Sequence, residues 1–476
     1  MTQLSTPQEV VEAALAAATT KGTVVIVTDR SEANLRWANS SLTTNGEMSS
    51  RSVTVVATSP SGDGTASGVV DRTVTSAAQV RALVEEAEAG ARAAEAASDA
   101  APLVTPELAG VGSDFGLKPE TTSIGAFADV AADLGEAMRG GGATRLHFGF
   151  AEQVVDSVYL GSSTGVRLRH VQPTGRLEMN AKNADWSASS YLGFTLRDPS
   201  EADVGAADAE LTRRLGWAER SIDLPAGRYE TILPPTALAD LLIYAYWLAE
   251  AKAADEGRSA FSRKGGGARI GDQLATLPVE IFSDPGRPGL ECAPFVVART
   301  SSSDTSVFDN GLPIPRQDWV SRGKLVALSG SRSYASTASG PSAPAASASG
   351  TPVRLAADNL ILEAPGASGS VDDLVASTSR GLLLSTMWYI RIVDPQTLLM
   401  TGLTRDGVYL VEDGEVVGAV NNFRWNISPL DVLNRITEIG ETVRCYPREW
   451  GDFFTRTAMP PVRVSDFNMS SVSQAR

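Results

Sequence analysis

The segment from residue 143 to residue 195 restricts the fold of this chain more than any other part of the sequence. Apolar and polar residues alternate along it with a period of two, and Gly-containing turns interrupt the alternation. Such alternation indicates strands with one buried and one polar face, and short turns between strands of this kind are typical of antiparallel pairing. We therefore expect an antiparallel meander here.

The rest of the N-terminal half combines further strands with helices. Apolar and β-branched runs predict strands at 22–30, 34–42 and 51–59, and Asn-Gly-Glu at 45–47 predicts a turn. A Pro-, Val- and Gly-rich stretch at 102–118 is a candidate sub-boundary within this half. Apolar residues at helical spacing predict four helices, over the first 20 residues, 76–99, 123–138 and 200–221.

After Gly227 the pattern changes to short strands separated by long loops. The Asp-Gly pair at 413–414 is a strong signal for a hairpin turn. Two stretches rich in small residues, 261–273 and 330–351, are expected to be flexible loops. The later elements are predicted as strands at 382–394, 398–420 and 421–428 and a helix at 429–437.

One apolar helix is expected in the C-terminal half. Residues 236–254 follow a Pro-Pro pair and place Leu and Ala on a wide apolar arc, which is typical of a buried helix. We therefore predict an α+β protein of two domains. Residues 1–225 form a mixed α/β domain with antiparallel strands and flanking helices. Residues 226–476 form a β-rich domain of curved antiparallel sheet with one buried helix.

The charge of the chain disfavours two classes of partner. The formal net charge is −15, and no basic stripe reverses it. Nucleic acids and anionic membranes both need a basic face, so neither is expected as a partner. No run of about 18 apolar residues is present, and the N-terminus is patterned as an amphipathic helix rather than as a signal peptide. We expect a cytoplasmic protein.

Histidine and cysteine are too scarce for most metal and triad chemistry. Cys292 and Cys445 lie far apart without CxxC spacing, which excludes the usual structural zinc site. His147 and His170 lie in predicted strands, and neither is near a GxSxG-type elbow. A metal-independent hydrolase using a serine or Cys445 remains a third hypothesis, disfavoured because nothing in the sequence pairs a base with a nucleophile.

Four stretches in a fixed order give the chain a resemblance to a known family. They are ETILPPTALADLL from 230, GRSAFSRKGGGARIGDQLATLPVEIFSDP from 257, FDNGLPIPRQDWVSRGKLVALSGSRSYA from 308, and the long segment 371–436. In order and spacing the chain resembles the TldD/TldE (PmbA) peptidase family over nearly its full length. The resemblance implies a two-subunit metallopeptidase, in which TldD binds zinc through HExxxH on a helix and a late Cys.

The resemblance also implies that this chain lacks that zinc site. Alignment on the GRSAF motif places the first His position at Leu242, the Glu at Ile243 and the second His at Trp247. Cys445 lies roughly where the late Cys is expected, but the residues around it match poorly. The chain therefore looks like the TldE-type subunit, with no catalytic residue, no metal and no cofactor of its own, and zinc is expected in a TldD-like partner.

The leading hypothesis is a non-catalytic subunit that closes the cleft of an HExxxH partner and holds extended, unfolded or modified peptides by strand pairing. The alternative is a stand-alone homodimeric protein that binds peptides without hydrolysis. Position in the sequence alone suggests five candidate substrate-binding residues, which are Ser259, Arg263, Trp388, Tyr389 and Arg405.

Overall fold

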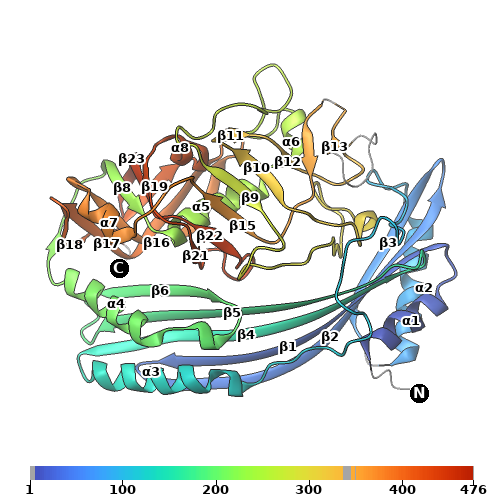
Figure 1. Ribbon diagram of the computed structural model, residues 1–476, viewed down its shortest axis with the longest axis horizontal. Coiled ribbons are helices and arrows are strands. Elements are labelled where there is room, and N and C mark those ends of the chain that lie inside the picture. Colours follow the sequence, from blue (N-terminus) through green and yellow to red (C-terminus); the bar gives the residue numbers. More distant parts are fainter. Residues whose placement is uncertain (1–5, 75, 336–344, 349, 475–476) are drawn as a thin grey trace.

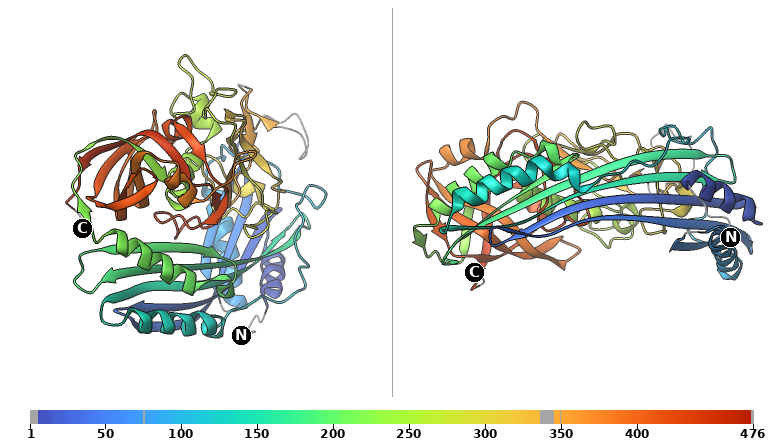
Figure 2. Two further views of the ribbon diagram at one scale, coloured as in Figure 1. Left: turned by 60° about the vertical axis from the view of Figure 1, so that its left-hand side comes forward. Right: turned by 90° about the horizontal axis from the view of Figure 1, so that it is seen from below.

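The computed structural model describes residues 6–74, 76–335, 345–348 and 350–474. A long, curved six-stranded sheet forms one layer, and the C-terminal elements pack along one of its faces (Figures 1 and 2). The predicted α+β class, with its mainly antiparallel strands, is confirmed. Within the described residues, no helix has both the length and the apolar character needed to cross a membrane.

The N-terminal sheet is antiparallel throughout, in the order β3-β2-β1-β4-β5-β6. Its last three strands are the predicted meander, and they pair over almost their whole length. The bounds are β1 Gly22–Ala38, β2 Ser41–Ser61, β3 Gly64–Thr73, β4 Arg145–Ser162, β5 Arg167–Asn183 and β6 Ser189–Leu196.

The first hairpin turns at a different place from the predicted one. β1 continues to Ala38, and the chain turns at Asn39 and Ser40, whose φ angles are 50° and 55°. Two left-handed residues in succession match the twist of a two-residue hairpin, and Asn tolerates that conformation well. The prediction of a turn at 45–47 was wrong, because Gly46 lies within β2 opposite Asn34.

Four helices cover one face of this sheet. Alternate β1 residues point toward them: Val25 and Val27 pack with the first two helices, and Leu35 and Trp37 with the other two. A capping box at Thr6 fixes the start of the first helix. The helices are α1 Pro7–Ala17, α2 Ala77–Ala93, α3 Ala128–Gly141 and α4 Val204–Trp217, with 3-10 turns at Ile124–Phe127 and Pro199–Glu201.

The opposite face of the sheet is covered by the C-terminal half. Val24 and Ile26 of β1 pack there against a cluster that contains Phe295 and Phe308. The stretch 102–118 crosses the contact between the two halves and is hydrogen-bonded to both, for example from Gly110 N–H to Gly311 O over 2.8 Å and from Ser113 N–H to Arg169 O over 2.8 Å. The domain boundaries proposed above remain a prediction.

A closed ring of five strands lies within the largest sheet of the C-terminal half, which has eight strands. β16 pairs with β8 on one side and with β17 on the other, which closes the order β16-β8-β23-β19-β17. The hairpin turn predicted at 413–414 is confirmed, between β17 and β18. The strands are β7 Ser221–Ile222, β8 Gly227–Leu233, β16 Arg380–Asp394, β17 Leu399–Glu412, β18 Glu415–Val420, β19 Phe423–Ile427, β20 Ile436–Ile439 and β23 Val462–Val472.

Two smaller sheets flank this ring, in the orders β11-β10-β9-β15-β22-β21 and β12-β14-β13. Their strands are β9 Glu280–Ser283, β10 Gln317–Ser321, β11 Lys324–Leu325, β12 Leu328–Ser329, β13 Ala345–Ala346, β14 Pro352–Arg354, β15 Leu360–Glu363, β21 Val443–Cys445 and β22 Thr457–Met459. The helices are α5 Pro235–Trp247, α6 Ala251–Asp255, α7 Val371–Ala376 and α8 Pro429–Asn434, with a 3-10 turn at Val307–Asp309.

The predicted apolar helix is buried but shorter than expected. α5 ends at Trp247, and α6 begins only at Ala251, so the continuous helix predicted over 236–254 was wrong. Ser329 explains the break, because its N–H donates to the carbonyl of Ala249 over 2.8 Å. That bond ties the interruption to β12. The largest apolar cluster among the described residues surrounds α5. The ribbon shows α5 among the strands of the C-terminal half (Figure 1).

The two predicted flexible loops differ in what the structure shows. The stretch 261–273 folds back on itself: Arg263 N–H donates to Gly267 O over 2.8 Å, and its guanidinium lies 2.8 Å from Asp272. Gly265, Gly266 and Gly267 all take left-handed φ angles there, which side chains disfavour. The stretch 330–351 falls partly outside the described residues.

Candidate functional site

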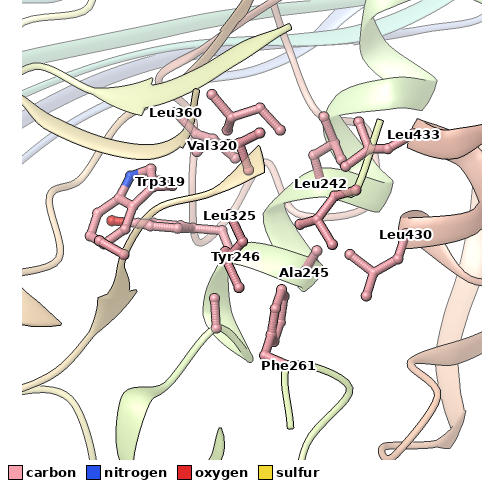
Figure 3. Close-up of a pocket in the computed structure, with 14 residues that line it drawn as sticks. Leu242, Ala245, Tyr246, Phe261, Trp319, Val320, Leu325, Leu360, Leu430 and Leu433 are labelled. Carbon is pink, nitrogen blue, oxygen red and sulfur yellow. The ribbon is translucent and has the colours of Figure 1, made fainter. Parts of the chain in front are cut away.

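The three aligned metal positions of α5 carry packed apolar side chains. Ile243 is fully buried, and Leu242 is 3% exposed. Leu242 and Ala245 face a small cavity of about 40 Å³ between α5, β10 and α8 (Figure 3). Its lining is hydrocarbon apart from the Tyr246 hydroxyl and the Trp319 indole, both of which bond elsewhere. The space is therefore apolar and too small for a large side chain of a peptide.

The zinc that the resemblance implies for a TldD-type subunit does not fit this position. Leu, Ile and Trp offer no ligand atom, and Cys445 is the only nearby thiol. Burial raises the pKa of Cys445 to about 12, and its sulfur lies 3.3 Å from the Thr457 hydroxyl. Within the described residues, no three His, Cys, Asp or Glu side chains are grouped so as to hold a metal ion.

The third aligned position, Trp247, belongs to an aromatic cluster. Its ring centroid lies 5.3 Å from that of Trp450, 6.2 Å from that of Phe454 and 6.3 Å from that of Tyr244, in edge-on or tilted arrangements. Such contacts between rings stabilise a cluster beyond simple area burial. The cluster holds the C-terminal end of α5 against the loop that follows β21.

A cavity of about 410 Å³ adjoins this aromatic cluster. Trp247 and Phe454 form part of its wall, and Phe453, which is 76% exposed, shows that it reaches the surface. Its lining mixes apolar side chains with polar groups such as Asp304 and Thr305. Concave sites of this size and character are typical of ligand binding.

The predicted residues Trp388, Tyr389 and Arg405 lie together at a bulge in β16. One extra residue is inserted between Trp388 and Arg391, opposite Gly402 of β17. The rings of Trp388 and Tyr389 meet edge to face at 5.7 Å, and the Arg405 guanidinium lies 5.7 Å from the Trp388 ring. Tyr389 is 56% exposed, which places an aromatic ring on the surface.

The other two predicted residues, Ser259 and Arg263, lie apart from the bulge, in the loop after α6. The Ser259 hydroxyl accepts from Phe261 N–H over 3.2 Å, and Phe261 lines the small apolar cavity. Arg263 is paired with Asp272. Both residues organise their own loop, and their role in substrate binding stays a prediction.

The residues that sequence reasoning missed lie in the loop 446–456. Glu449 accepts from the backbone N–H groups of Tyr389 and Ile390 over 3.1 and 3.0 Å. Its own N–H donates to Asp240 of α5 over 3.0 Å. Burial raises the pKa of both carboxyl groups, and Asp240 is fully buried. The loop thus joins the buried helix to the exposed bulge.

The same loop is tied to the N-terminal sheet by a polar network. Arg448 lies 4.5 Å from the rings of both Tyr191 and Trp388 and 3.4 Å from the Glu178 carboxylate. Arg176 of β5 donates to the Tyr446 hydroxyl over 3.0 Å. Charged groups that are half-buried in this way need such partners. No periodicity in the sequence marks these residues, because they meet only when the two layers pack.

Arg145 Nε lies 3.4 Å from the Nε2 of His147, which has two further polar neighbours that a sequence pattern does not reveal. Its Nε2 lies 2.8 Å from an Asp208 oxygen, and its Nδ1 lies 3.4 Å from the Ser40 hydroxyl. The imidazole is fully buried, and the Ser40 hydroxyl also accepts from the His147 backbone N–H over 3.1 Å. The arrangement therefore braces the β1–β2 turn against α4. The other histidine, His170, is bonded to Gln172, and burial lowers its pKa.

Comparison with known proteins identifies a matching family model and proteins of similar structure. A model of the PmbA/TldA metallopeptidase C-terminal domain matches residues 226–471. TldE from Thermococcus kodakarensis is similar in structure, with a TM-score of 0.73, 14% identity, and coverage of 97% of this chain and 99% of that chain. At so low an identity the likeness shows a shared fold alone.

Two proteins described as modulators of DNA gyrase share the fold as well. The one from Thermotoga maritima has a TM-score of 0.74 and 18% identity, over 97% of this chain and 99% of that chain. The one from Bacteroides thetaiotaomicron has a TM-score of 0.70 and 13% identity, over 98% of each chain. A comparison with curated proteins gives no match.

Proposed function

Because this chain belongs to the PmbA/TldA metallopeptidase family, we propose that it is the non-catalytic subunit of a TldD/TldE-type peptidase. Its partner is a homologous subunit with an intact HExxxH helix, and the zinc of the complex belongs to that partner. In this proposal the complex is cytoplasmic, and the chain has the two domains 1–225 and 226–476. One of the proteins that share its fold carries the name TldE.

The observation that carries the proposal is how the side chains of α5 are packed. Leu242 and Ile243 are packed into a hydrocarbon core, and Trp247 is packed among aromatic rings. Placing a hydrated metal and a general base here would need three substitutions and a cavity larger than about 40 Å³. In this proposal the helix contributes packing to the fold and carries no catalytic group.

The second part of the proposal is that this subunit holds extended peptides. Its support is the 410 Å³ cavity beside Trp247 and the exposed aromatic bulge at Tyr389. Aromatic rings and Arg side chains bind peptides of many sequences, and free backbone groups add strand pairing. Trp388, Tyr389 and Arg405 are the proposed contacts at the bulge, and Ser259 and Arg263 are those of the separate loop after α6.

Reconstitution tests this function directly. The purified chain is mixed with the HExxxH homologue from the same organism, and cleavage of an unfolded protein such as β-casein is followed. We expect each chain alone to be inactive and the mixture to be active. Cleavage by this chain alone that a chelator stops would show that the non-catalytic assignment is wrong.

The alternative function is a homodimeric peptide-binding protein without a peptidase partner. Its specific support is that the cavity and the bulge both lie within one chain. Sedimentation velocity of the chain with and without the HExxxH homologue separates the two functions. A mixed complex of the two chains supports the leading proposal, and an unchanged homodimer supports the alternative.

A further inference from the structure

We propose that Glu449 is a positioning residue for peptide binding. Its carboxylate holds the backbone at Tyr389 in a left-handed conformation, so that the tyrosine ring stands on the surface as a contact for extended peptides in which acidic residues flank an aromatic one. This inference rests on the proposed peptide-holding function and assigns a task to a residue outside the family's metal motif.

The backbone at Tyr389 is the first step of the argument. Three residues other than glycine take a left-handed φ in the middle of a strand: Tyr389 at 51°, Asp406 at 54° and Asp466 at 54°. Asp adopts this conformation readily, whereas a bulky aromatic residue there is an outlier in a strained backbone conformation. An exposed tyrosine held in such a conformation points to a use for its ring.

The second step is the group that stabilises this backbone. The two carboxylate oxygens of Glu449 each accept one N–H, from Tyr389 over 3.1 Å and from Ile390 over 3.0 Å. The Arg391 guanidinium adds a third contact at 3.3 Å. The Glu449 side chain is only 9% exposed, so water competes little for these bonds. In the resulting bulge Ile390 points into the core and Tyr389 points outward.

The third step is the anchor of Glu449 itself. Its N–H donates to Asp240 on α5 over 3.0 Å, and the next residue, Trp450, donates its indole N–H to the Asp240 carbonyl over 2.8 Å. A buried helix is among the most rigid parts of a protein, so these two bonds hold the Glu449 backbone, and with it the carboxylate, in a fixed position. The helix that carries zinc ligands in the catalytic homologue here carries the support of a binding element.

The charges around the ring indicate the class of peptide. Arg391 lies 5.9 Å from the Tyr389 ring, and Arg405 and Arg448 both stack on Trp388. The side chain of Arg391 is 64% exposed. Two of these arginines have acidic neighbours, Glu449 beside Arg391 and Glu178 beside Arg448, whereas Arg405 is exposed and adds positive charge beside the Trp388 ring. The rings and the exposed Arg391 and Arg405 thus form a small aromatic surface with arginines at its edge. An aromatic residue with acidic neighbours complements this surface.

The test measures peptide binding and local backbone order together. The probe is a labelled, unstructured 15-residue peptide with repeated Glu-Phe pairs, titrated against the isolated full chain by fluorescence anisotropy. Glu449→Ala is expected to weaken binding about tenfold, a loss of about 1.4 kcal/mol. Glu449→Gln, which retains one acceptor oxygen at a similar position, is expected to lose less. Hydrogen exchange in Glu449→Ala should accelerate over residues 388–391.

Two controls separate positioning from general damage. Glu47→Ala removes another carboxylate bonded to a backbone N–H, that of Ile124, and is expected to leave binding unchanged. Tyr389→Gly keeps the left-handed backbone without the ring and is expected to bind weakly with full stability. A Lys-Phe version of the peptide is expected to bind more weakly than the Glu-Phe version.

Each outcome has a defined meaning. Unchanged affinity or unchanged exchange over 388–391 in Glu449→Ala overturns the positioning role, while strong binding by the wild type still supports the proposed function. Equal binding of the Lys-Phe peptide overturns the acidic preference. A wild-type chain that binds neither peptide, in isolation or with its partner, overturns the peptide-holding function and this inference with it.

Discussion

Single buried polar residues decide much of the chemistry open to this chain. The carboxyl group of Asp240 lies on α5, and the thiol of Cys445 and the carboxyl group of Glu449 lie next to that helix. Burial raises the pKa of all three. Backbone N–H groups bond to Glu449 and to one oxygen of Asp240, while the other Asp240 oxygen is buried without a hydrogen bond from any described residue. The raised pKa keeps the Cys445 thiol protonated and unreactive near neutral pH.

Cys445 is predicted to be unreactive in the folded protein. Burial raises the pKa of Cys292 and of Cys445 to about 12, so almost no thiolate forms near neutral pH. Iodoacetamide should label neither cysteine in the native chain and both in urea, as read by mass spectrometry. Cys445→Ala should leave cleavage by the assembled complex unchanged. A large loss of activity would revive the hydrolase hypothesis that uses this thiol.

Asp240 is predicted to make stability depend on pH. Because burial raises its pKa in the folded state, its neutral form is compatible with folding, and stability falls as pH rises through the folded pKa. The slope is at most about 1.4 kcal/mol per pH unit for one proton. Asp240→Asn should remove this slope in urea denaturation between pH 5 and pH 9. Parallel curves for the two proteins would contradict the assignment.

At the scale of elements, α5 shows how packing holds a short apolar helix in place. It packs between the ring of strands, at β16 and β8, and the strands β21 and β22 of the neighbouring sheet, and residues on all of its sides are buried. Pro at its first turn begins it, and the bond from Ser329 to Ala249 sets the break that follows it. Its contribution to stability comes from packing rather than from helix propensity.

Leu242→Ala is predicted to destabilise the protein strongly. Leu242 is 3% exposed and already borders a cavity, so truncation enlarges an apolar void that water does not fill. We expect a loss of about 2–4 kcal/mol in the free energy of unfolding, measured with urea. Leu42→Ala, at a leucine that is 54% exposed, is the matched control and should change stability little. Equal losses of stability in the two variants would show that packing of Leu242 beside the cavity does not stabilise the protein.

At the scale of the whole molecule, the contact between the two layers combines an apolar part and a polar part. The apolar part packs β1 and β4 against Phe295 and its neighbours. The polar part joins Arg176 and Glu178 of β5 to the loop 446–456. Because that loop also holds α5 and the Tyr389 bulge, packing of the two layers affects the proposed binding surface.

Arg176→Ala is predicted to weaken this contact. Arg176 lies 3.1 Å from the partly buried Glu152 and 2.5 Å from the exposed Asp452, so its loss removes a cation beside the Glu152 carboxylate. Removing one member of a buried pair costs about 3–5 kcal/mol, and we expect a loss at or below the lower end of that range because this pair is only partly buried. Arg72→Ala, which breaks a pair of exposed side chains with Glu86, is the control and should cost little. Calorimetry and urea denaturation measure both.

Local sequence patterns predicted most of the helices and strands correctly. They failed where a contact with a distant part of the chain determines where an element ends. The meander at 143–195 and the turn at 413–414 follow from alternation and from Asp-Gly, which are properties of neighbouring residues. The break after Trp247 depends on Ser329, some 80 residues away, and no pattern in the helix itself signals it. The prediction of a turn at 45–47 was wrong because the chain already reverses at Asn39 and Ser40.

The candidate site divides in the same way. Trp388, Tyr389 and Arg405 could be named from the sequence and do lie together, because neighbouring strands of one hairpin bring them into register. Glu449 and Asp240 could not be named, because their roles depend on bonds to backbone atoms far along the chain. Sequence patterns carry no record of such bonds.

By itself, the sequence determined the α+β class, the family resemblance and the absence of ligand side chains at three positions of one helix. These properties reside in residue types and short spacings, which folding does not alter. Only the tertiary structure decided that Glu449 joins α5 to an exposed, left-handed Tyr389. Burial, hydrogen-bond geometry and desolvation act between residues that meet only after the layers pack, and they determine what those residues can do.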